Sequence, residues 1–332
     1  MRLLVLSVWS AFLLPVPSVA QVPYVFRDGI EEVDYEKLNR IESFKLPDSG
    51  QFRETTFVHG EDADYSRHSM DFSISADGKI IFDSNTGLMW ERQLNWRWGK
   101  TVPPQGESRP QDVFTYKDGE PRRRPYHEGV QYCKALRLGG YDDWRMPNIK
   151  EAHTVANYGS ARPAIHIKYF EDVDPGIPGY GDRGKGGMWA GPLAPDHLNS
   201  GWHMGFIDGH FMGYPRTGYK TTRCVRAENN GSYFLPDFVD NGDGTVTDRV
   251  ANLMWLPQSD GVERDWESSI QYCEDLVSAG YSDWKLPSNK ELSSTVDLRR
   301  QKPAIDVEFF QTRITAPTTG RGHRKRASRR ST

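Results

Sequence analysis

The chain is poor in cysteine and has no long apolar run beyond its first residues. Three Cys among 332 residues exclude a disulfide-dense scaffold. After the start of the chain, no stretch approaches the roughly eighteen apolar residues of a membrane-spanning helix. The biased compositions of fibrous, coiled-coil and collagen-like proteins are also missing. The chain does contain 37% hydrophobic residues, 31 Gly, 21 Pro and 10 Trp, at a mean hydropathy of −0.69. This composition favours a loop-rich protein of two modest domains.

Catalytic signatures are missing as well. The sequence contains no G-x-S-x-G, H-E-x-x-H or C-x-x-C. Residues 179–184 match G-x-G-x-x-G and residues 179–185 nearly match a P-loop. Neither match lies between a hydrophobic strand and a helix, as phosphate binding requires, so we interpret this stretch as a surface loop. We therefore expect that the protein is not an enzyme.

The first twenty residues have the three parts of a secretory signal. Arg2 supplies a positive charge, residues 3–14 an apolar region, and Ser-Val-Ala at 18–20 a small-x-small cleavage pattern. We therefore expect residues 1–20 to be a signal peptide that is cleaved. The mature chain is then secreted, periplasmic or on the cell surface, with no membrane span. An uncleaved anchor is the alternative, although the apolar region is too short to cross a bilayer.

Charge is distributed unevenly along the chain. The net charge is −3, yet the last twelve residues carry six Lys and Arg and no acidic residue. Setting aside those six charges and that of Arg2 leaves −10 on residues 21–320. Binding of duplex nucleic acid needs a basic footprint on the folded surface, so we expect no nucleic-acid partner. We interpret residues 319–332 as a basic, disordered tail; binding of a polyanion by this tail is the alternative.

An internal repeat organises the rest of the chain. At an offset of 140 residues, identical residues recur as Tyr132 and Tyr272, Cys133 and Cys273, Trp144 and Trp284, Lys150 and Lys290, Glu151 and Glu291, and Phe170 and Phe310. Upstream, Leu-Met-Trp at 88–90 returns at 253–255 with an offset of 165, because the first copy carries an insert between residues 97 and 126. Self-similarity of this kind predicts a duplicated domain.

The repeat sets the domain boundaries that we expect. Residues 21–75 form an N-terminal extension, residues 76–228 form copy 1, and residues 238–318 form copy 2. Copy 2 contains no equivalent of Gly-Met-Trp at 187–189 or of Cys-Val-Arg at 224–226. We therefore expect copy 2 to be an incomplete domain with an exposed core edge, as a truncation or a frameshift would produce.

Each copy repeats one local pattern. A turn leads into a β-rich run that ends at Leu-Met-Trp, as in a hairpin. An amphipathic helix follows, and its apolar face in copy 2 is predicted to consist of Trp266, Ile270, Cys273 and Val277. A second short helix begins with a capping box, Asn148-x-x-Glu151 in copy 1 and Ser288-x-x-Glu291 in copy 2. These elements predict a loop-rich α+β fold with short helices and antiparallel strands.

Several spaced motifs occur together in this chain. They are Asp-Asn-Gly-Asp-Gly-Thr-Val-Thr-Asp at 240–248, Leu-Met-Trp at 88–90 and 253–255, Gly-Tyr-x-Asp-Trp at 140–144 and 280–284, and Arg-Cys-Val-Arg at 223–226. Their combination resembles the Lcl C-terminal domain family, a bacterial domain of unknown function named after a collagen-like adhesin, over residues 76–310. Trp-Arg-x-Pro-x-x-x-Glu, which starts at Trp144, also resembles the C-type-lectin-like and formylglycine-generating-enzyme folds, which implies a lectin-like core.

The family resemblance implies one disulfide. In the family, the cysteine of the first helix and the cysteine of the closing Cys-Val-Arg look like a natural pair, which implies a Cys133–Cys224 bond. A bond that closes a loop of about ninety residues should add roughly 3 to 5 kcal/mol of stability. Cys273 then has no partner. Formylglycine generation requires reactive cysteines, which we cannot place here, so the second resemblance implies no activity.

Three histidines raise the question of a zinc site. His197, His203 and His210 lie within fourteen residues. No further ligand at helical spacing completes a tetrahedral set, and residues 206–211 indicate a hairpin with a two-residue Asp-Gly turn. We therefore expect a structural or surface role for these histidines.

Three aspartates raise the same question for calcium. Asp240, Asp243 and Asp248 lie in an oxygen-rich turn of the kind that folds around hard cations, but their spacing is not that of an EF-hand. A turn held by Asx-type hydrogen bonds is the preferred interpretation. We expect no cofactor, with calcium as the alternative.

A Gly-rich and aromatic stretch of copy 1 favours a binding function. The candidate ligand-binding residues are Trp189, Trp202, His203, Asp208, His210 and Tyr214. Aromatic faces with a few polar groups suit carbohydrates or protein surfaces. We therefore predict an exported, non-catalytic binding protein, adhesin-like or carbohydrate-binding, whose partner is a carbohydrate or a cell-surface protein. A structural or protein-interaction module of the cell envelope without glycan affinity is the alternative.

The tryptophans at repeated positions call for a simpler explanation. Trp90, Trp144, Trp255 and Trp284 occupy equivalent places in the two copies, so we expect them in the core of each. For Trp189, a core role stays open beside the binding role.

Overall fold

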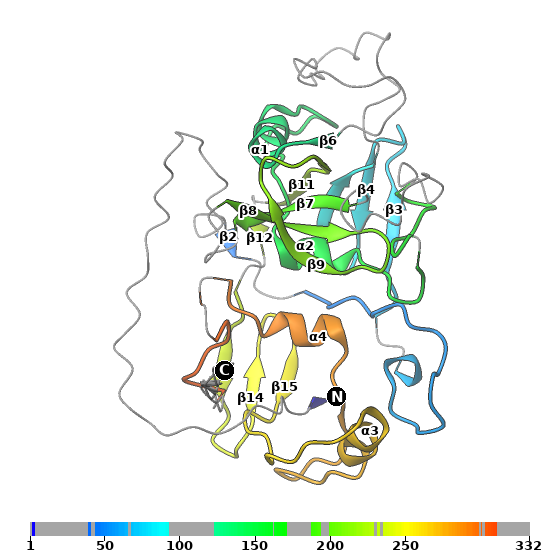
Figure 1. Cartoon of the computed structure of the whole chain (residues 1–332), viewed down its shortest axis with the longest axis vertical. Helices are drawn as coiled ribbons and strands as arrows, with labels where there is room; N and C mark the ends of the chain where they lie inside the picture. Colours follow the sequence, from blue (N-terminus) through cyan, green and yellow to red (C-terminus); the bar gives the residue numbers. More distant parts are fainter. Residues whose placement is uncertain are drawn as a thin grey trace, which may run out of the picture.

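The structure, a computed structural model, stacks the two copies on each other (Figure 1). It describes residues 2–3, 39–40, 44–65, 68–92, 123–161, 163–170, 187–193, 199–228, 231–232, 235–298, 300 and 303–310. Strands dominate this part of the chain, most neighbouring strands are antiparallel, and the helices are short. The predicted α+β fold class is therefore confirmed.

The described part of copy 1 contains two sheets. The first has the order β11-β5-β4-β3 and consists of β3 (Phe72–Ile74), β4 (Ile80–Asp83), β5 (Leu88–Glu91) and β11 (Val225–Ala227), all antiparallel to their neighbours. The second has the order β6-β10-β7-β8-β9 and consists of β6 (Arg123–Arg124), β7 (Gly187–Leu193), β8 (Ser200–Gly205), β9 (Phe211–Pro215) and β10 (Lys220–Thr221). The predicted hairpin that ends at Leu-Met-Trp is the β4–β5 pair.

The sheet of copy 2 repeats the first sheet of copy 1 with one change. Its order is β13-β14-β15-β1-β16, with β13 (Phe238–Asp240), β14 (Val246–Asp248), β15 (Leu253–Trp255), β1 (Arg2–Leu3) and β16 (Trp284–Lys285). β13 to β15 are antiparallel, like β3 to β5, but β1 runs parallel to both of its neighbours. Backbone from the expected signal peptide therefore lies inside this sheet. A separate parallel pair joins β2 (Asn39–Arg40) to β12 (Gly231–Ser232).

The helices begin where the sequence predicts. They are α1 (Tyr126–Ala135), α2 (Ile149–Thr154), α3 (Trp266–Glu274) and α4 (Asn289–Ser294), with a 3-10 helix η2 (Asp62–Asp64). Both predicted capping boxes are present: Asn148 Oδ1 accepts from the Glu151 N–H at 2.9 Å, and Ser288 Oγ accepts from the Glu291 N–H at 3.3 Å. The local signals were sufficient because the capping partners lie only three residues apart.

The predicted apolar face of α3 is only partly correct. Ile270 and Cys273 are buried, but Trp266 is 56% exposed and Val277 is 73% exposed. Since α3 ends at Glu274, Val277 lies beyond the helix and helical spacing does not apply to it. Tyr126, which takes the place of Trp266 in copy 1, is buried against Trp189 of β7. The described part of copy 2 has no counterpart of the sheet that contains β7, so no tryptophan of such a sheet covers Trp266 there.

The core of each copy is built around its repeated tryptophans. Trp90, Trp144, Trp255 and Trp284 are each at most 2% exposed, which confirms the predicted core role. The Cys133–Cys224 disulfide is also present and joins α1 to the residue before β11, with Cα atoms 5.4 Å apart. Cys273 is a free, buried cysteine.

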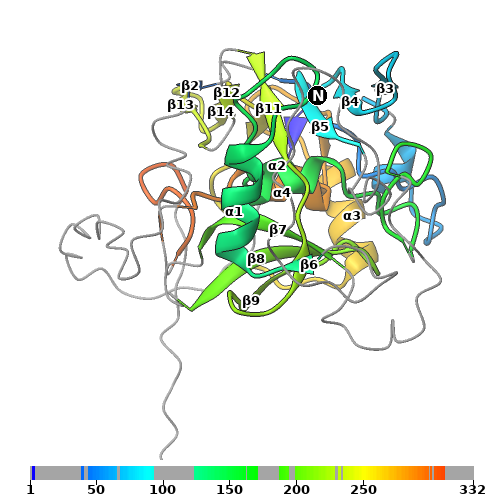
Figure 2. The same cartoon turned by 90° about the horizontal axis from the view of Figure 1, so that it is seen from above.

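The two copies meet through equivalent helices. α2 of copy 1 contacts α4 of copy 2, and the two helices lie side by side near the centre of the molecule when it is seen from above (Figure 2). The predicted capping boxes therefore start the two helices that join the copies.

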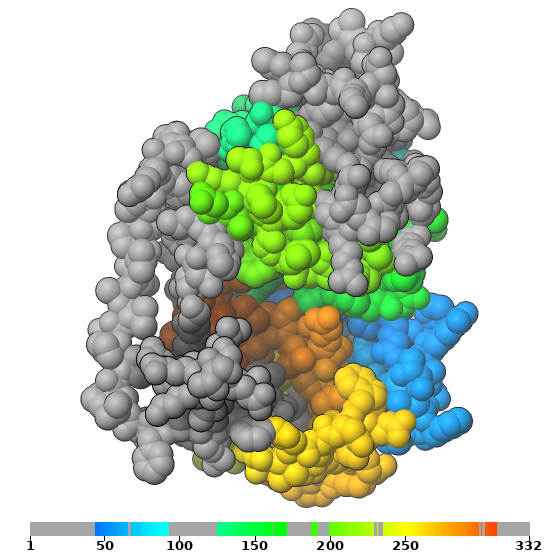
Figure 3. Space-filling model, in the orientation of Figure 1, coloured from blue at the N-terminus to red at the C-terminus, as the bar shows by residue number. Residues whose placement is uncertain are grey.

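The N-terminal extension covers copy 2. In the space-filling view, the blue surface of residues 44–65 lies against the orange and yellow surface of copy 2 (Figure 3). The Phe44 N–H donates to the Val250 carbonyl at 3.2 Å, and the Tyr65 hydroxyl donates to Glu274 of α3 at 2.5 Å. This segment therefore contacts copy 2 just after β14 and at helix α3. β1 occupies the interior position between β15 and β16, so the backbone of these two strands is paired there while residues 2–3 are present. The exposed core edge expected for the mature chain stays a prediction.

Candidate functional site

The β8–β9 hairpin carries most of the candidate ligand-binding residues. β8 ends at Gly205 and β9 begins at Phe211, so five residues connect them instead of the predicted two-residue Asp-Gly turn. The Gly205 N–H donates to the His210 carbonyl at 2.8 Å, and the Gly209 N–H donates to the Gly205 carbonyl at 3.0 Å. The hairpin is confirmed, and its longer turn places Asp208 at an exposed tip.

The hairpin divides the candidate residues between two faces of the sheet. Successive residues of a strand point to opposite faces, so Trp202 and His203 are separated. Trp202 packs on the main core cluster of copy 1, together with Met204. On the other face, Trp189 packs beneath Tyr126 of α1, with ring centroids 5.5 Å apart. Because Trp189 is fully buried, it has no surface that a ligand can touch, and the core role left open for it is the one observed.

His203, His210, Tyr214 and Lys220 gather on the α1 face, and we call these four residues the His203 cluster. The His203 ring lies 5.6 Å from the His210 ring and 5.4 Å from the Tyr214 ring, measured between centroids. The Lys220 ammonium lies 3.7 Å from the centre of the Tyr214 ring, in cation–π geometry. A Cβ on Gly205 would collide with the His210 ring, so the glycine is what lets this imidazole lie on β8.

His203 is held in its neutral form at the base of the cluster. Its side chain is fully buried, and Nδ1 donates to the Met212 carbonyl at 3.1 Å. Burial, followed by the positive charge of Lys220 and the neighbouring His210, lowers the pKa of His203 to about 3. With the proton fixed on Nδ1, Nε2 carries a lone pair, and this buried atom has no hydrogen-bond partner among the described residues.

His210 and Asp208 form the rim of the cluster. His210 Nδ1 and its backbone N–H both donate to Asp208 Oδ1. Burial raises the pKa of Asp208, but these hydrogen bonds outweigh burial and leave that pKa below its ordinary value. The Asp208 side chain is 63% exposed, whereas His210 Nε2 is buried without a partner among the described atoms. The Asp208 carboxylate and the His210 imidazole therefore lie together just before β9, and the His203 ring contacts both the His210 ring and the Tyr214 ring.

The candidate metal residues are arranged differently. Asp240 accepts from the Gly242 N–H at 2.8 Å, Asp243 accepts from the Thr245 N–H at 3.0 Å, and buried Asp248 accepts from the Val250 N–H at 3.0 Å. Each carboxylate thus binds its own local turn. His197 lies outside the described residues, as does the glycine-rich stretch 179–186. Where the structure describes side chains, no three His, Cys, Asp or Glu residues gather as metal ligands.

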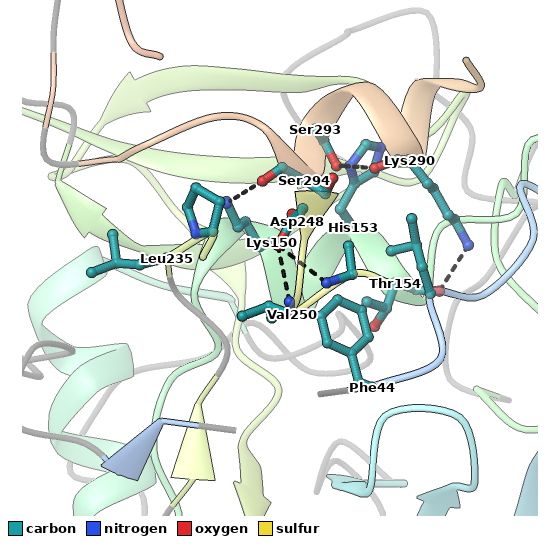
Figure 4. A pocket seen from close by; sticks show the side chains of 13 residues that line it. Phe44, Lys150, His153, Thr154, Leu235, Asp248, Val250, Lys290, Ser293 and Ser294 are labelled. Atoms are coloured by element: carbon teal, nitrogen blue, oxygen red, sulfur yellow. Dashed lines mark hydrogen bonds between the residues drawn. The ribbon is translucent and has the colours of Figure 1, made fainter. Parts of the chain in front are cut away.

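A second polar site lies between the copies and escaped the sequence analysis (Figure 4). Lys150 Nζ donates to the Ser294 carbonyl and Lys290 Nζ donates to the Thr154 carbonyl, both at 2.9 Å. Burial lowers the pKa of Lys290 to about 7 despite the carboxylates of Asp83, Asp48 and Asp62. The sequence did contain one signal for this site, because Lys150 and Lys290 recur at the repeat offset of 140 residues. These contacts join the copies, which is a structural role.

Comparison with known proteins fits this architecture. The model of the Lcl C-terminal domain family matches residues 79–226 and 244–326, which is more than half of the chain. The protein therefore belongs to the Lcl C-terminal domain family and contains two copies of the domain, the second shorter. Comparisons with curated proteins and with solved structures find no significant match. None of the described helices is long and apolar enough to cross a membrane.

Proposed function

We propose that the protein is an exported, non-catalytic binding protein with a lectin-like core, and that the rim of the His203 cluster contacts a carbohydrate. The single observation that carries this proposal is the Asp208–His210 pair, in which an exposed carboxylate accepts from a partly exposed imidazole. Hydrogen bonds from the His210 imidazole and backbone N–H fix this carboxylate at the tip of the hairpin, where a ligand can reach it.

The exposed groups of this pair and of its neighbours on β9 suit a sugar. Asp208 offers a carboxylate, and the partly exposed rings of His210 and Tyr214 offer faces against which CH groups can pack. Met212 adds an exposed apolar side chain on the same strand. This combination of aromatic faces and few polar groups is typical of carbohydrate sites. Membership in a family named after an adhesin and the disulfide support a protein that works outside the cytoplasm.

A non-catalytic role is proposed because two groups with strongly altered pKa values, His153 and Lys290, have structural partners. His153, whose pKa burial lowers to about 3, contacts Ser293 and Tyr158. Lys290 binds backbone carbonyls at the interface between the copies.

A glycan array tests the proposal directly. The full chain, with its Cys133–Cys224 bond oxidised, is screened with and without calcium. His210→Ala and Tyr214→Ala should each reduce the signal about tenfold or more, as for residues central to an interface. Tyr219→Ala is the matched control because Tyr219 is an exposed tyrosine outside the His203 cluster. A folded wild-type protein without signal, or variants that bind like wild type, would contradict the carbohydrate proposal. Binding that requires calcium would revive the turn at 240–248 as a candidate calcium site.

A protein-interaction module is the second candidate. Trp266, the first residue of α3, is 56% exposed, and Val262, four residues before it, is 51% exposed. Exposed apolar side chains of this size are typical of protein contacts. Two results together would favour this role over carbohydrate binding. The protein would cross-link to a partner on intact cells in a way that is lost on Trp266→Ser, and it would give no signal on the glycan array.

A further inference from the structure

The sheets of the two copies share one equivalent position, which is filled by a different part of the chain in each copy. In copy 1, β11 pairs with β5 and also bridges to Arg145, and it belongs to the same copy. In copy 2, the corresponding position between β15 and β16 holds β1. We call this position the strand slot.

The occupants of the two positions match in register. Val225 lies opposite Trp90 and bridges to Arg145, and Leu3 lies opposite Trp255 and Lys285, which are the equivalents of those two residues. At the next level of the sheet, Arg226 lies opposite Met89. Arg2 lies opposite the equivalent of that methionine, Met254. An aliphatic residue beside an arginine therefore fills both positions, although the two strands run in opposite directions.

Copy 1 shows why an arginine suits this position. The guanidinium of Arg226 pairs with Asp143, with 2.7 Å between Nε and Oδ1, and lies 3.7 Å from the centre of the Tyr141 ring. Copy 2 repeats both partners as Asp283 and Tyr281 at the same offset of 140 residues. The strand slot therefore carries the residue types that recognise an arginine by charge and by stacking.

The occupant of the strand slot belongs to the segment that export is expected to remove. Arg2 and Leu3 lie within residues 1–20, which have the pattern of a signal peptide. Without β1, the facing backbone groups of β15 and β16 lose their ladder partners inside the sheet. Unpaired strands of this kind bind extended peptides by β-strand addition.

We propose that the strand slot of copy 2 binds an extended strand of a partner polypeptide, one that carries an arginine next to an aliphatic residue, once the N-terminal segment has been removed. The Arg2–Leu3 strand holds the slot in the uncleaved chain. Main-chain hydrogen bonds to β15 and β16 supply affinity, and Asp283 selects the arginine.

The experiment begins with the full chain, folded intact, with a protease site inserted after Ala20. A labelled hexapeptide copied from residues 222–227, with serine in place of its cysteine, is added before and after cleavage, and binding is followed by fluorescence anisotropy. The peptide should bind only after cleavage. A peptide with glutamate in place of the second arginine should not bind. Asp283→Asn should weaken binding about tenfold, as expected for the loss of a charge-assisted hydrogen bond. Glu267→Gln, which changes an exposed carboxylate of α3, should have no effect.

Several results would overturn the proposal. Equal binding before and after cleavage, or binding that ignores Asp283→Asn, would remove the strand slot as the site. Residues 1–20 could stay bound after cleavage, or the exported protein could retain Arg2. Either result would make β1 the permanent occupant of the strand slot. A cleaved chain that dimerises and excludes the peptide would place a second copy in the slot. Cleavage could also unfold copy 2. In that case, adding the arginine peptide should restore the melting transition of copy 2, and more so at higher peptide concentration. A peptide that restores no transition would also count against the proposal.

Discussion

Lys150 and Lys290, which occupy the same position in the two copies, each donate a hydrogen bond to the last residue of the other's helix. Lys150 reaches the Ser294 carbonyl at the end of α4, and Lys290 reaches the Thr154 carbonyl at the end of α2. The reciprocity gives the interface an approximate twofold symmetry, like that of an isologous dimer whose subunits are joined in one chain. Each ammonium also complements the negative end of a helix.

The reciprocal lysines should be important for stability. Lys290→Met keeps the length of the side chain but leaves the Thr154 and Asp48 carbonyls without their charged donor. We expect a loss of about 2 kcal/mol in the free energy of unfolding, measured with urea. Lys168→Met is the control, because Lys168 is exposed. Equal stability of the two variants would show that the interface does not depend on this contact.

Acid should destabilise the protein through its buried histidines. The folded protein lowers the pKa of His203 and of His153 to about 3, whereas both protonate near pH 6.5 when unfolded. The unfolded chain therefore binds more protons below pH 6.5, and stability falls as pH falls from 6.5 toward 3. Each histidine contributes up to about 1.4 kcal/mol per pH unit in this range.

The substitution His203→Phe isolates one of these contributions. It should reduce the difference in unfolding free energy between pH 7 and pH 5, because the phenyl ring has no proton to gain. His59→Phe, at an exposed histidine, serves as the control. A pH dependence that is unchanged by His203→Phe would mean that His203 is not held neutral in the folded state.

The disulfide should stabilise the protein far more than the third cysteine does. Replacing Cys133 and Cys224 by alanine opens a loop with a sequence separation of 91 residues, and the chain-entropy model gives a loss of roughly 4.6 kcal/mol. Cys273→Ala, the equivalent position in copy 2, should cost about 1 kcal/mol, because only a small buried group is lost. Thermal melting of the wild type, the double variant and Cys273→Ala checks this order of stabilities. Equal melting temperatures for the two variants would refute it.

The free thiol should react only after unfolding. Burial raises the pKa of Cys273 to about 12, so little thiolate exists at neutral pH. A thiol reagent should titrate no group in the native protein and one group in denaturant. Rapid reaction of the native protein would show that the sheet of copy 2 opens around Cys273.

The two copies offer a matched test of their buried ion pairs. Arg145 binds Glu151 through both terminal nitrogens at 2.7 Å, whereas Lys285 binds Glu291 at 2.7 Å and also Asp62 at 3.3 Å. Glu151→Gln should cost about 3 kcal/mol because it leaves a buried charge without its carboxylate. Glu291→Gln should cost less, because Asp62 remains. A larger loss for Glu291→Gln in urea unfolding would contradict this ranking.

The sequence alone determined the duplication, the fold class, the capping boxes and the burial of the four repeated tryptophans. All of these depend on patterns within a few residues or on comparison of one copy with the other. The resemblance to the family added the Cys133–Cys224 pair. Short-range capping and helical spacing have a fixed geometry, so they can be predicted without knowledge of the rest of the chain.

Tertiary structure alone decided how copy 2 is completed and which candidate residues meet. Residues 44–65 and β1 lie far along the chain from the sheet and helix that they cover, and no local pattern in them indicates those partners. Similarly, the register of β7 with β8 placed Trp189 and His203 on the same face and Trp202 on the other. Contacts between distant segments depend on the packing of the whole chain, because burial of apolar surface is not directional.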